Sequence, residues 1–414
     1  MKKTFFRYLI VFISLITGYL LFMLLGCLVP DKPVQRNIAR SVPVFMNQWD
    51  YPYAVFEKPG CKLDNFTDAL ILNMAYHTNR DSLKTSILLN PYLHKDIYMT
   101  INLAKTVAGE RDGTSYYSRY WHGSSFLMRF LLLLGNYEHI RQILFVTSML
   151  LLLTAAAFIY REAGLPYMLG FFSGFTLLNG FIMQVSIQFF PVMAIALISS
   201  IVLCIKWRDF SSVLMIFFVA GSITSFFDLI TIPLITMGMP LLLYLVLDRN
   251  TEEPWQKSLW KIVLIAAIWF AGYAVTWATK WIIATLATDV NVIQDATGVG
   301  LRYSQPADDG SRWTALTMNL QLLNFPLILS LLSITAIVSF LFFNKRGLKP
   351  ALFCLLTALT PYAWYLIISR HSYIHYWFTY RSQMVSISGI FLCFILLTDW
   401  QKVKSLPERI GKRS

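Results

Sequence analysis

Two aspartates four residues apart are the first residues whose types and spacing suggest chemistry. Asp64 and Asp68 lie in a polar stretch that follows the first long apolar run of the chain. On a helix, residues at i and i+4 share one face, so both carboxylates would point the same way. A carboxylate at a membrane surface can remove the proton from an attacking hydroxyl group, and we prefer Asp64 over Asp68 as this catalytic base. The alternative is structural, because Asp is also common at helix starts.

An aromatic and basic run follows in the same polar stretch. Residues 116–123 contain three tyrosines and a tryptophan around Arg119 and His122. Such a surface can hold a sugar ring or a lipid headgroup, so both residues are candidates for substrate binding. Trp and Tyr also gather at membrane interfaces without any catalytic role, which is the structural alternative.

Asp228 is a further candidate for substrate binding. It lies between two apolar runs, 212–227 and 229–246, that are only just long enough to cross a bilayer. The turn between them is therefore expected close to the hydrocarbon, where a carboxylate is costly and is usually kept for a partner or a function. The alternative is a cap for the next helix.

Residues 370–381 concentrate arginine, histidine and aromatic side chains. The planar guanidinium of Arg381 suits phosphate oxygens, and His371 and His375 can add a hydrogen bond or a proton. The two histidines also have the i, i+4 spacing of a zinc site, but the sequence has no HExxH motif or cysteine cluster to complete it. We assign no metal site and no required cofactor, and leave a divalent metal open.

The composition places the chain among membrane proteins. Of 414 residues, 56% are hydrophobic and only 14% are charged, whereas soluble domains carry roughly 25% charged residues. The net charge of +13 is explained by lysines and arginines that hold cytoplasmic loops in place, so we expect no nucleic-acid partner. The expected fold is an all-α polytopic membrane protein.

The apolar runs predict about ten transmembrane helices in a single transmembrane domain, 1–414, with both termini in the cytoplasm. A large first extracytoplasmic loop, 29–141, should carry short helices, including an interfacial piece at 124–134. A second outer loop is expected at 288–322 and a basic cytoplasmic tail at 399–414. Lysines and arginines fall in the proposed inner connections, as the positive-inside rule requires. The expected spans are 8–28, 143–160, 167–183, 192–207, 212–227, 229–246, 260–284, 323–343, 351–368 and 383–397.

Two features of the start of the chain leave alternatives open. Residues 24–27 are similar to a lipoprotein processing site, although the apolar run before them is longer than a usual signal peptide core. Cys27 and Cys61 both fall on the expected outer side, so a disulfide between them is compatible with the sequence but undetermined.

At these residues the chain resembles the GT-C class of integral membrane glycosyltransferases, in plan similar to the protein mannosyltransferases and aminoarabinose transferases. The resemblance rests on a cytoplasmic start, an acidic motif soon after the first span and about ten helices. It departs in the motif, since the family often has adjacent or alternate acids and this chain has DxxxD. Asp64 would match the catalytic carboxylate, and Arg381 and His375 would lie near the lipid phosphate.

The resemblance implies transfer of a sugar from a polyprenyl-phosphate donor to a glycan, lipid or protein acceptor. The active site would face outward from a bacterial plasma membrane. A polysaccharide or lipid transporter or polymerase is the main alternative, but transporters usually place ionisable groups at the midplane, where this chain has almost none. A non-enzymatic partner of an envelope assembly is the third class.

Overall fold

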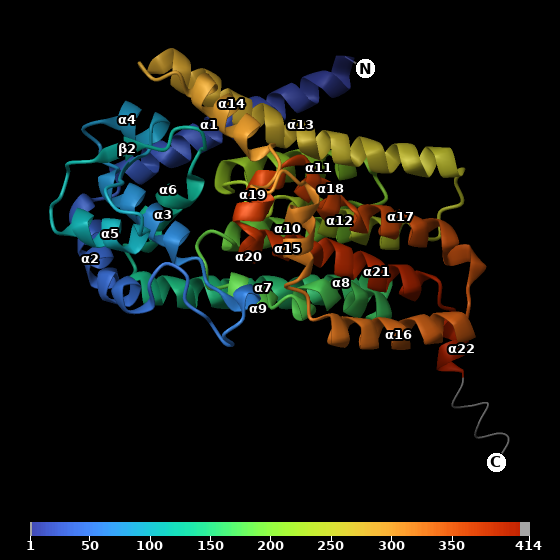
Figure 1. Ribbon diagram of the computed structural model, residues 1–414. Helices are drawn as coiled ribbons and strands as arrows, with labels where there is room; N and C mark the ends of the chain where they lie inside the picture. Colours follow the sequence, from blue (N-terminus) through green and yellow to red (C-terminus); the bar gives the residue numbers. More distant parts are fainter. Residues whose placement is uncertain (1, 406–414) are drawn as a thin grey trace.

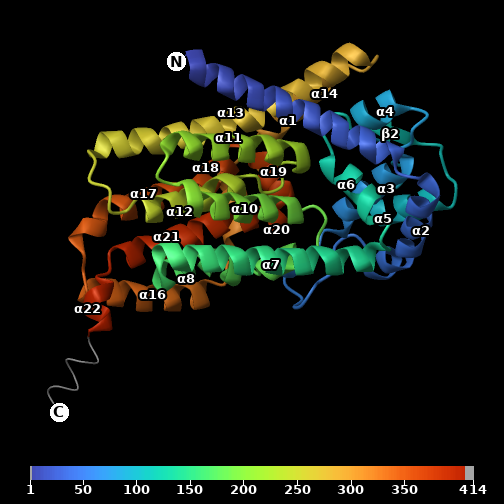
Figure 2. The same ribbon diagram turned by 180° about the vertical axis from the view of Figure 1, so that it is seen from behind.

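Long helices that lie side by side form the body of the protein, and a smaller group of short helices covers one end of it (Figures 1 and 2). The computed structural model describes residues 2–405. Of the expected basic tail, residues 406–414 lie outside the described part. The only sheet among the described residues is a single two-stranded one, which agrees with the expected all-α class.

We call the long helices the bundle. Six of its segments are long and apolar enough to cross a membrane: 6–28, 137–163, 210–227, 255–287, 345–367 and 376–396. A seventh is a pair of helices bent by 81°, and three more apolar helices are shorter. The bundle helices are α1 (Lys2–Leu28), α7 (Tyr137–Ala163), α8 (Leu165–Leu177), α10 (Phe190–Lys206), α11 (Phe210–Phe227), α12 (Leu234–Leu247), α13 (Trp255–Ala287), α16 (Phe325–Leu341), α17 (Leu348–Ala358), α18 (Thr360–Ile367) and α21 (Met384–Leu396).

Each apolar run of the sequence coincides with helix in the bundle. Two runs are broken: the run at 167–183 divides into α8 and the short α9 (Gly180–Met183), and the run at 351–368 divides into α17 and α18. Asn179, in the left-handed region at φ 54°, separates α8 from α9. Hydropathy therefore locates these helices correctly, and local backbone geometry sets the breaks.

Small residues allow the closest helix contacts. A Cβ atom on Gly221 of α11 would lie 2.1 Å from the carbonyl oxygen of Trp269 on α13, and one on Gly272 of α13 would lie 2.2 Å from that of Phe218 on α11. Between helices in lipid, such close approach replaces the hydrophobic driving force that water would supply. α11 and α13 are therefore fixed together by backbone-to-backbone packing.

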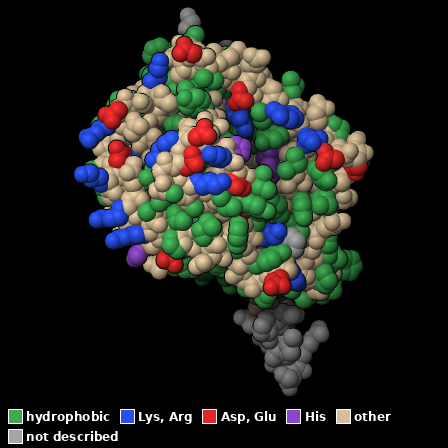
Figure 3. All heavy atoms as spheres, turned by 60° about the vertical axis from the view of Figure 1, so that its left-hand side comes forward, with side chains coloured by type: hydrophobic (Ala, Val, Ile, Leu, Met, Phe, Trp, Pro, Cys, Tyr) green, Lys and Arg blue, Asp and Glu red, His purple; other side chains and the backbone are tan. Residues whose placement is uncertain are grey.

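We call residues 29–136 the cap. Its elements are α2 (Asp31–Gln48), the 3-10 helix η1 (Pro59–Cys61), α3 (Asn65–His77), α4 (Leu83–Leu88), β1 (Pro91–Leu93), α5 (Met99–Val107), β2 (Thr114–Tyr116) and α6 (Gly123–Leu131). The strands pair antiparallel. Figure 3 shows acidic and basic side chains interspersed over the end of the molecule that carries the cap.

The cap is more structured than the sequence indicated. The 18-residue helix α2 was not predicted, although it is amphipathic and buries Val34, Ile38 and Phe45. The piece predicted at 124–134 is helical as α6, but it packs on α1 and α3, and Phe126 and Met128 are buried.

The remaining elements connect the bundle helices or, in one case, follow the last of them. They are α14 (Val292–Tyr303), α15 (Trp313–Leu320), η2 (Lys345–Gly347), α19 (Ser369–Ile374), α20 (Tyr376–Thr379), η3 (Tyr380–Gln383) and α22 (Trp400–Lys404). All five cysteines are free and buried, so Cys27 and Cys61 are not joined in this structure.

Candidate active site

Asp64 lies where the cap meets the bundle. It caps the N-terminus of α3, where its Oδ1 accepts the backbone N–H of Thr67 at 3.0 Å. Its Oδ2 is buried and has no hydrogen-bond partner. Burial raises the pKa of this carboxyl to about 7, against the lowering effect of the Thr67 N–H; Asp68 raises it further, and Arg381 lowers it.

Asp68 has a different environment from Asp64. Its carboxylate accepts the Tyr137 hydroxyl at 2.5 Å, the Ser186 hydroxyl at 3.1 Å, and the backbone N–H groups of Ile187 and Gln188 at 3.2 and 3.3 Å. Burial raises its pKa, although these hydrogen bonds and nearby Arg141 oppose the shift. Because both oxygens are occupied, Asp68 joins the cap to α7 and to the start of α10, and Asp64 is the aspartate that has an oxygen free.

Arg381 is far from Asp64 in the sequence but lies near it in the fold. It is fully buried on η3, and its Nη2 donates to the carbonyl of Lys62, two residues before Asp64, at 2.8 Å. Its Nε and Nη1 have no partner. The guanidinium lies 4.8 Å from the ring centroid of Phe189, and it makes no ion pair within 4.0 Å among the described residues. A buried cation with two free donors is therefore held near Asp64, close enough to lower its pKa but more than 4.0 Å from its carboxylate oxygens.

We call Asp64 and Arg381 the acid–arginine site. Aromatic residues lie near it: Tyr51 packs edge-on against Trp377 with ring centroids 4.7 Å apart. Burial raises the pKa of Tyr51, and Asp64 raises it further. The Tyr380 hydroxyl donates to the carbonyl of Gly60 at 2.6 Å. The loop before α3 and the turn at 376–383 thus meet over the site, although the sequence separates them by more than 300 residues.

The two histidines lie next to this site. His371 and His375 have ring centroids 4.8 Å apart, and His375 stacks on Phe378 at 5.0 Å. Phe378 in turn packs against Phe189, at 6.1 Å, beneath Arg381. Burial lowers the pKa of His371 well below its usual value and that of His375 to about 4, so both rings are neutral at pH 7. They can supply hydrogen bonds there but no positive charge.

The predicted residues Arg119 and His122 belong to a second group, the Arg119 cluster, with Tyr117, Tyr120 and Asp295. The guanidinium of Arg119 lies 4.4 Å from the Tyr117 ring centroid and pairs with Asp295 at 3.3 Å. His122 Nε2 is 2.7 Å from the Tyr117 carbonyl oxygen, and burial lowers the pKa of this histidine to about 3.

The Arg119 cluster and the histidine pair meet through one aromatic residue. Tyr303, at the end of α14, packs against His371 with ring centroids 4.8 Å apart. Tyr303 also interacts electrostatically with Tyr117 and Tyr120, and contributes to their raised pKa values. Tyr303 thus links the Arg119 cluster to the histidine pair, which adjoins the acid–arginine site through Phe378 and Phe189.

The carboxylate of Asp228 accepts hydrogen bonds from within its own loop. Its carboxylate accepts the backbone N–H and the hydroxyl of Thr231, and Ile230 between them adopts the left-handed conformation at φ 64°. Burial raises the pKa of Asp228 to about 6. A β-branched residue in this region is strained, and the aspartate stabilises the turn that forces it. The structure thus gives Asp228 a turn-forming role and brings it no partner from the acid–arginine site.

Two buried cations were missed in the sequence. Arg129 of α6 donates to four backbone carbonyls, those of residues 26, 29, 75 and 78, each at 2.7 Å, and to Asp31 at 2.6 Å. Lys280 of α13 donates to the carbonyls of Ile87 and Leu88 at 2.8 and 3.0 Å. Both side chains are fully buried. The sequence does contain a signal for both residues. Each is a cation inside an apolar run, where a charge requires a partner.

The described residues contain no cluster of metal-binding side chains. Between residues 2 and 405, no group of three or more His, Cys, Asp or Glu side chains is placed to hold a metal ion. The pair formed by His371 and His375 has no third ligand of these types, so the described residues supply no metal centre.

Taken with the apolar helices, this fold defines the class as an all-α polytopic membrane protein. No family model, curated protein or solved structure matches the chain. Its activity must therefore be inferred from the site itself.

Proposed function

We propose that the protein is a membrane glycosyltransferase that moves a sugar from a polyprenyl-phosphate donor to a hydroxyl of a glycan, lipid or protein. The proposal rests chiefly on one observation. Asp64 keeps a free carboxylate oxygen and Arg381 keeps two free donors, and both are buried at the same junction of cap and bundle. Base and phosphate ligand are the two groups that such a transfer needs.

The proposed step uses these groups in opposite roles. The acceptor hydroxyl gives its proton to Asp64 as its oxygen forms a bond to the anomeric carbon of the sugar. The bond between that carbon and the donor phosphate oxygen breaks, and its electron pair remains on the departing polyprenyl phosphate. Arg381 stabilises this growing negative charge. Because His371 and His375 are neutral at pH 7, they contribute hydrogen bonds only.

Polar atoms near the site suit a sugar. The side-chain oxygens of Gln188 and Gln383 are buried and have no hydrogen-bond partner. The same is true of the Nδ1 atom of His371. Gln188 precedes Phe189 in the chain, Gln383 is two residues after Arg381, and the His371 ring centroid lies 4.8 Å from that of His375. Buried polar groups are rarely left unpaired, and each one here is available to a sugar hydroxyl.

The proposal includes a topology. All ten predicted spans cross the membrane, both termini are cytoplasmic, and the cap and the acid–arginine site face outward from a bacterial plasma membrane. Supporting this, Lys206 ends α10, whose other end adjoins Phe189 beside Arg381, and Arg249 and Lys349 line one pocket where α12 ends and α17 begins. These positions agree with the positive-inside rule. A lipid-linked donor fits such a site because its leaving group remains in the bilayer.

The test measures donor lipid and transfer in the same preparations. Polyprenyl phosphate that co-purifies with the full chain is quantified by mass spectrometry for wild type, Asp64→Asn, Arg381→Gln and the control Arg370→Gln. Arg370 is in the same turn, but it is partly exposed and pairs with Asp308. We expect lipid to be retained by all but Arg381→Gln. Transfer should fall roughly 10²- to 10⁴-fold in Asp64→Asn; Asn also caps helices well, so the fold should be preserved.

Two results would contradict the proposal. One is that no preparation retains polyprenyl phosphate above the background of an unrelated membrane protein. The other is that Asp64→Asn supports full transport or polymerisation of an envelope glycan in cells, which would favour the transporter or polymerase class.

A further inference from the structure

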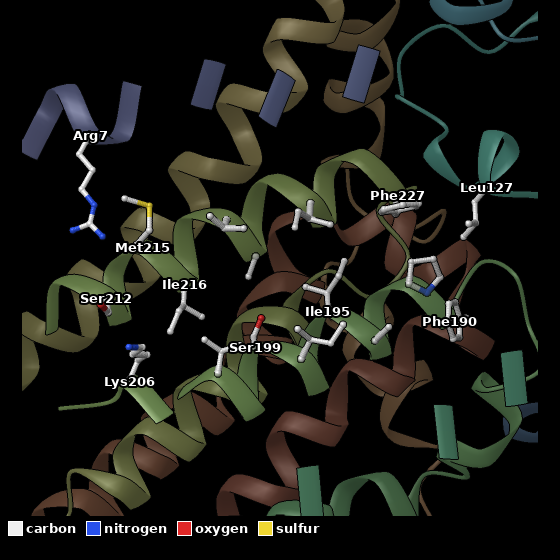
Figure 4. A pocket seen from close by; sticks show the side chains of 17 residues that line it. Arg7, Leu127, Phe190, Ile195, Ser199, Lys206, Ser212, Met215, Ile216 and Phe227 are labelled. Carbon is white, nitrogen blue, oxygen red and sulfur yellow. The ribbon is translucent and has the colours of Figure 1, made fainter. Parts of the chain in front are cut away.

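A lateral groove of about 520 Å³ lies between α10 and α11, and neither residue of the acid–arginine site lines it (Figure 4). α1 borders it at one end through Arg7, and α6 borders it at the other through Leu127. Its volume is within the range of about 300 to 1,000 Å³ that small-molecule sites occupy. The groove is thus large enough for a specific ligand.

The walls of the groove are aliphatic along most of its length. α10 and α11 each contribute branched side chains: Ile195, Ile198, Val202, Ile216, Val219 and Ile223. From Pro191 to Lys206, the rise of α10 gives the groove a length of about 22 Å. That exceeds half of a hydrocarbon core of about 30 Å, so an acyl chain that starts at one end can lie wholly inside.

Charge is confined to one end. Figure 4 shows Arg7, Lys206 and Ser212 together there, whereas Phe190, Phe227 and Leu127 form the other end. Within the described part of the chain, neither Arg7 nor Lys206 makes an ion pair within 4.0 Å.

The carboxylate beside this end is already engaged. The hydrogen bond from the Ser212 hydroxyl lowers the pKa of Asp209, and nearby Arg7 lowers it further. Its oxygens, however, cap α11 by accepting the backbone N–H groups of Ser211 and Ser212, both at 3.2 Å. The two cations are consequently left to bind an anion at the mouth of an apolar groove.

We propose that this groove binds an anionic phospholipid, with its phosphate between Arg7 and Lys206 and one acyl chain along α10 and α11. Arginine and lysine both bind phosphate strongly, and the aliphatic walls suit the chain. The lipid would also fill the space between α1 and α10, and so hold α1 in place.

The charges distinguish this lipid from the proposed sugar donor. The donor phosphate is assigned to Arg381, whose guanidinium lies on Phe189 just before α10 begins. Lys206 is the last residue of the same helix. The two phosphate sites are therefore at opposite ends of α10, and the groove proposal does not depend on the proposed function.

Phosphatidylglycerol and phosphatidylcholine with identical acyl chains provide the test. The full chain is purified in mild detergent, and binding of each lipid is measured by native mass spectrometry and by the shift in thermal unfolding temperature. We expect phosphatidylglycerol to bind wild type more tightly than phosphatidylcholine. The double variant, Arg7→Gln with Lys206→Gln, should weaken the binding of phosphatidylglycerol by about tenfold for each removed cation.

Two variants test the two parts of the site separately. Arg208→Gln removes a nearby cation that does not line the groove, since its guanidinium stacks on Trp207 at 4.6 Å; it should bind phosphatidylglycerol as wild type does. Ala194→Phe keeps the charges but fills the groove, and should weaken both lipids.

Three outcomes would overturn the proposal. They are equal stabilisation by the two lipids, equal loss of phosphatidylglycerol in Arg208→Gln and in the double variant, and co-purification of polyprenyl phosphate that disappears in the double variant. The last would show that the groove holds the donor instead.

Discussion

A carboxylate with a pKa near 7 changes its charge in the pH range in which cells live, and Asp64 is such a group. If Asp64 is the base, it must be ionised to accept a proton. Activity should therefore rise about tenfold per pH unit below 7 and level off above 7. The measurement is a pH profile of kcat/KM between pH 5 and 9, in which Asp64→Asn should lose this ionisation together with the rate.

The same shift affects folding with the opposite sign. The pKa of Asp64 is raised from 3.8 in the unfolded chain to about 7 in the folded protein, so the folded state prefers the protonated form. Stability should fall as pH rises from about 4 to 7 and stay level above 7, by at most roughly 4 kcal/mol. Thermal unfolding of wild type and Asp64→Asn across this range should converge at low pH; parallel curves would contradict the buried-acid assignment.

Asp68 supports a prediction about stability alone. Tyr137→Phe removes the 2.5 Å hydrogen bond to its carboxylate, and should lower the free energy of unfolding by about 1 to 3 kcal/mol. Tyr160→Phe is the control, because Tyr160 is on the same helix with 57% of its side chain exposed. If the two variants unfold at the same temperature, the contact between cap and α7 is not stabilising.

Sequence reasoning found both aspartates but could not separate their roles. The distinction depends on Tyr137 and Ser186, which lie 69 and 118 residues beyond Asp68 and reach it only in the folded chain. Asp228 illustrates the converse. Its neighbours along the chain, not distant ones, occupy its carboxylate. It holds the turn before α12 and is not the helix cap considered from the sequence, since the residue at the N-cap of α12 is Pro233.

At the level of elements, the bundle was predictable because each of its helices lies in an apolar run of the sequence. The cap was less so: its helices are short or mixed, and α2 carries a proline at position 43 inside it. α2 is held by burial of its apolar face against α3 and α5. The sequence alone does not show which elements pack against this face.

The contact of α11 with α13 supplies the element-scale prediction. Gly221→Ala would place a methyl group 2.1 Å from a backbone oxygen that cannot move without its helix, and should cost about 1 to 3 kcal/mol. Gly18→Ala on α1 is the matched control, because nothing lies within 4 Å of its added atom. The check is thermal unfolding in detergent, and equal midpoints would show that the two helices separate easily.

Across the whole molecule, the membrane topology depends on whether the short helices cross the membrane. α8 has 13 residues, which rise about 20 Å against a hydrocarbon core of about 30 Å. Yet α8 lies directly on α21, since a Cβ on Gly174 would be 2.2 Å from the carbonyl oxygen of Met384. A helix packed along a spanning partner, and extended by its flanking residues, is favoured to cross with it.

Labelling of introduced cysteines decides between the two topologies. Asp112→Cys in the cap and Lys257→Cys near the start of α13 place thiols on exposed sites, whereas all five native cysteines are buried. Five bundle helices, α7, α8, α10, α11 and α12, lie between these positions in the chain. If all five cross, the positions are on opposite sides, and an impermeant maleimide should label only Asp112→Cys in intact cells. If only the two long helices α7 and α11 cross, the count becomes even and both cysteines label alike, which would remove the outward-facing site from the proposed function.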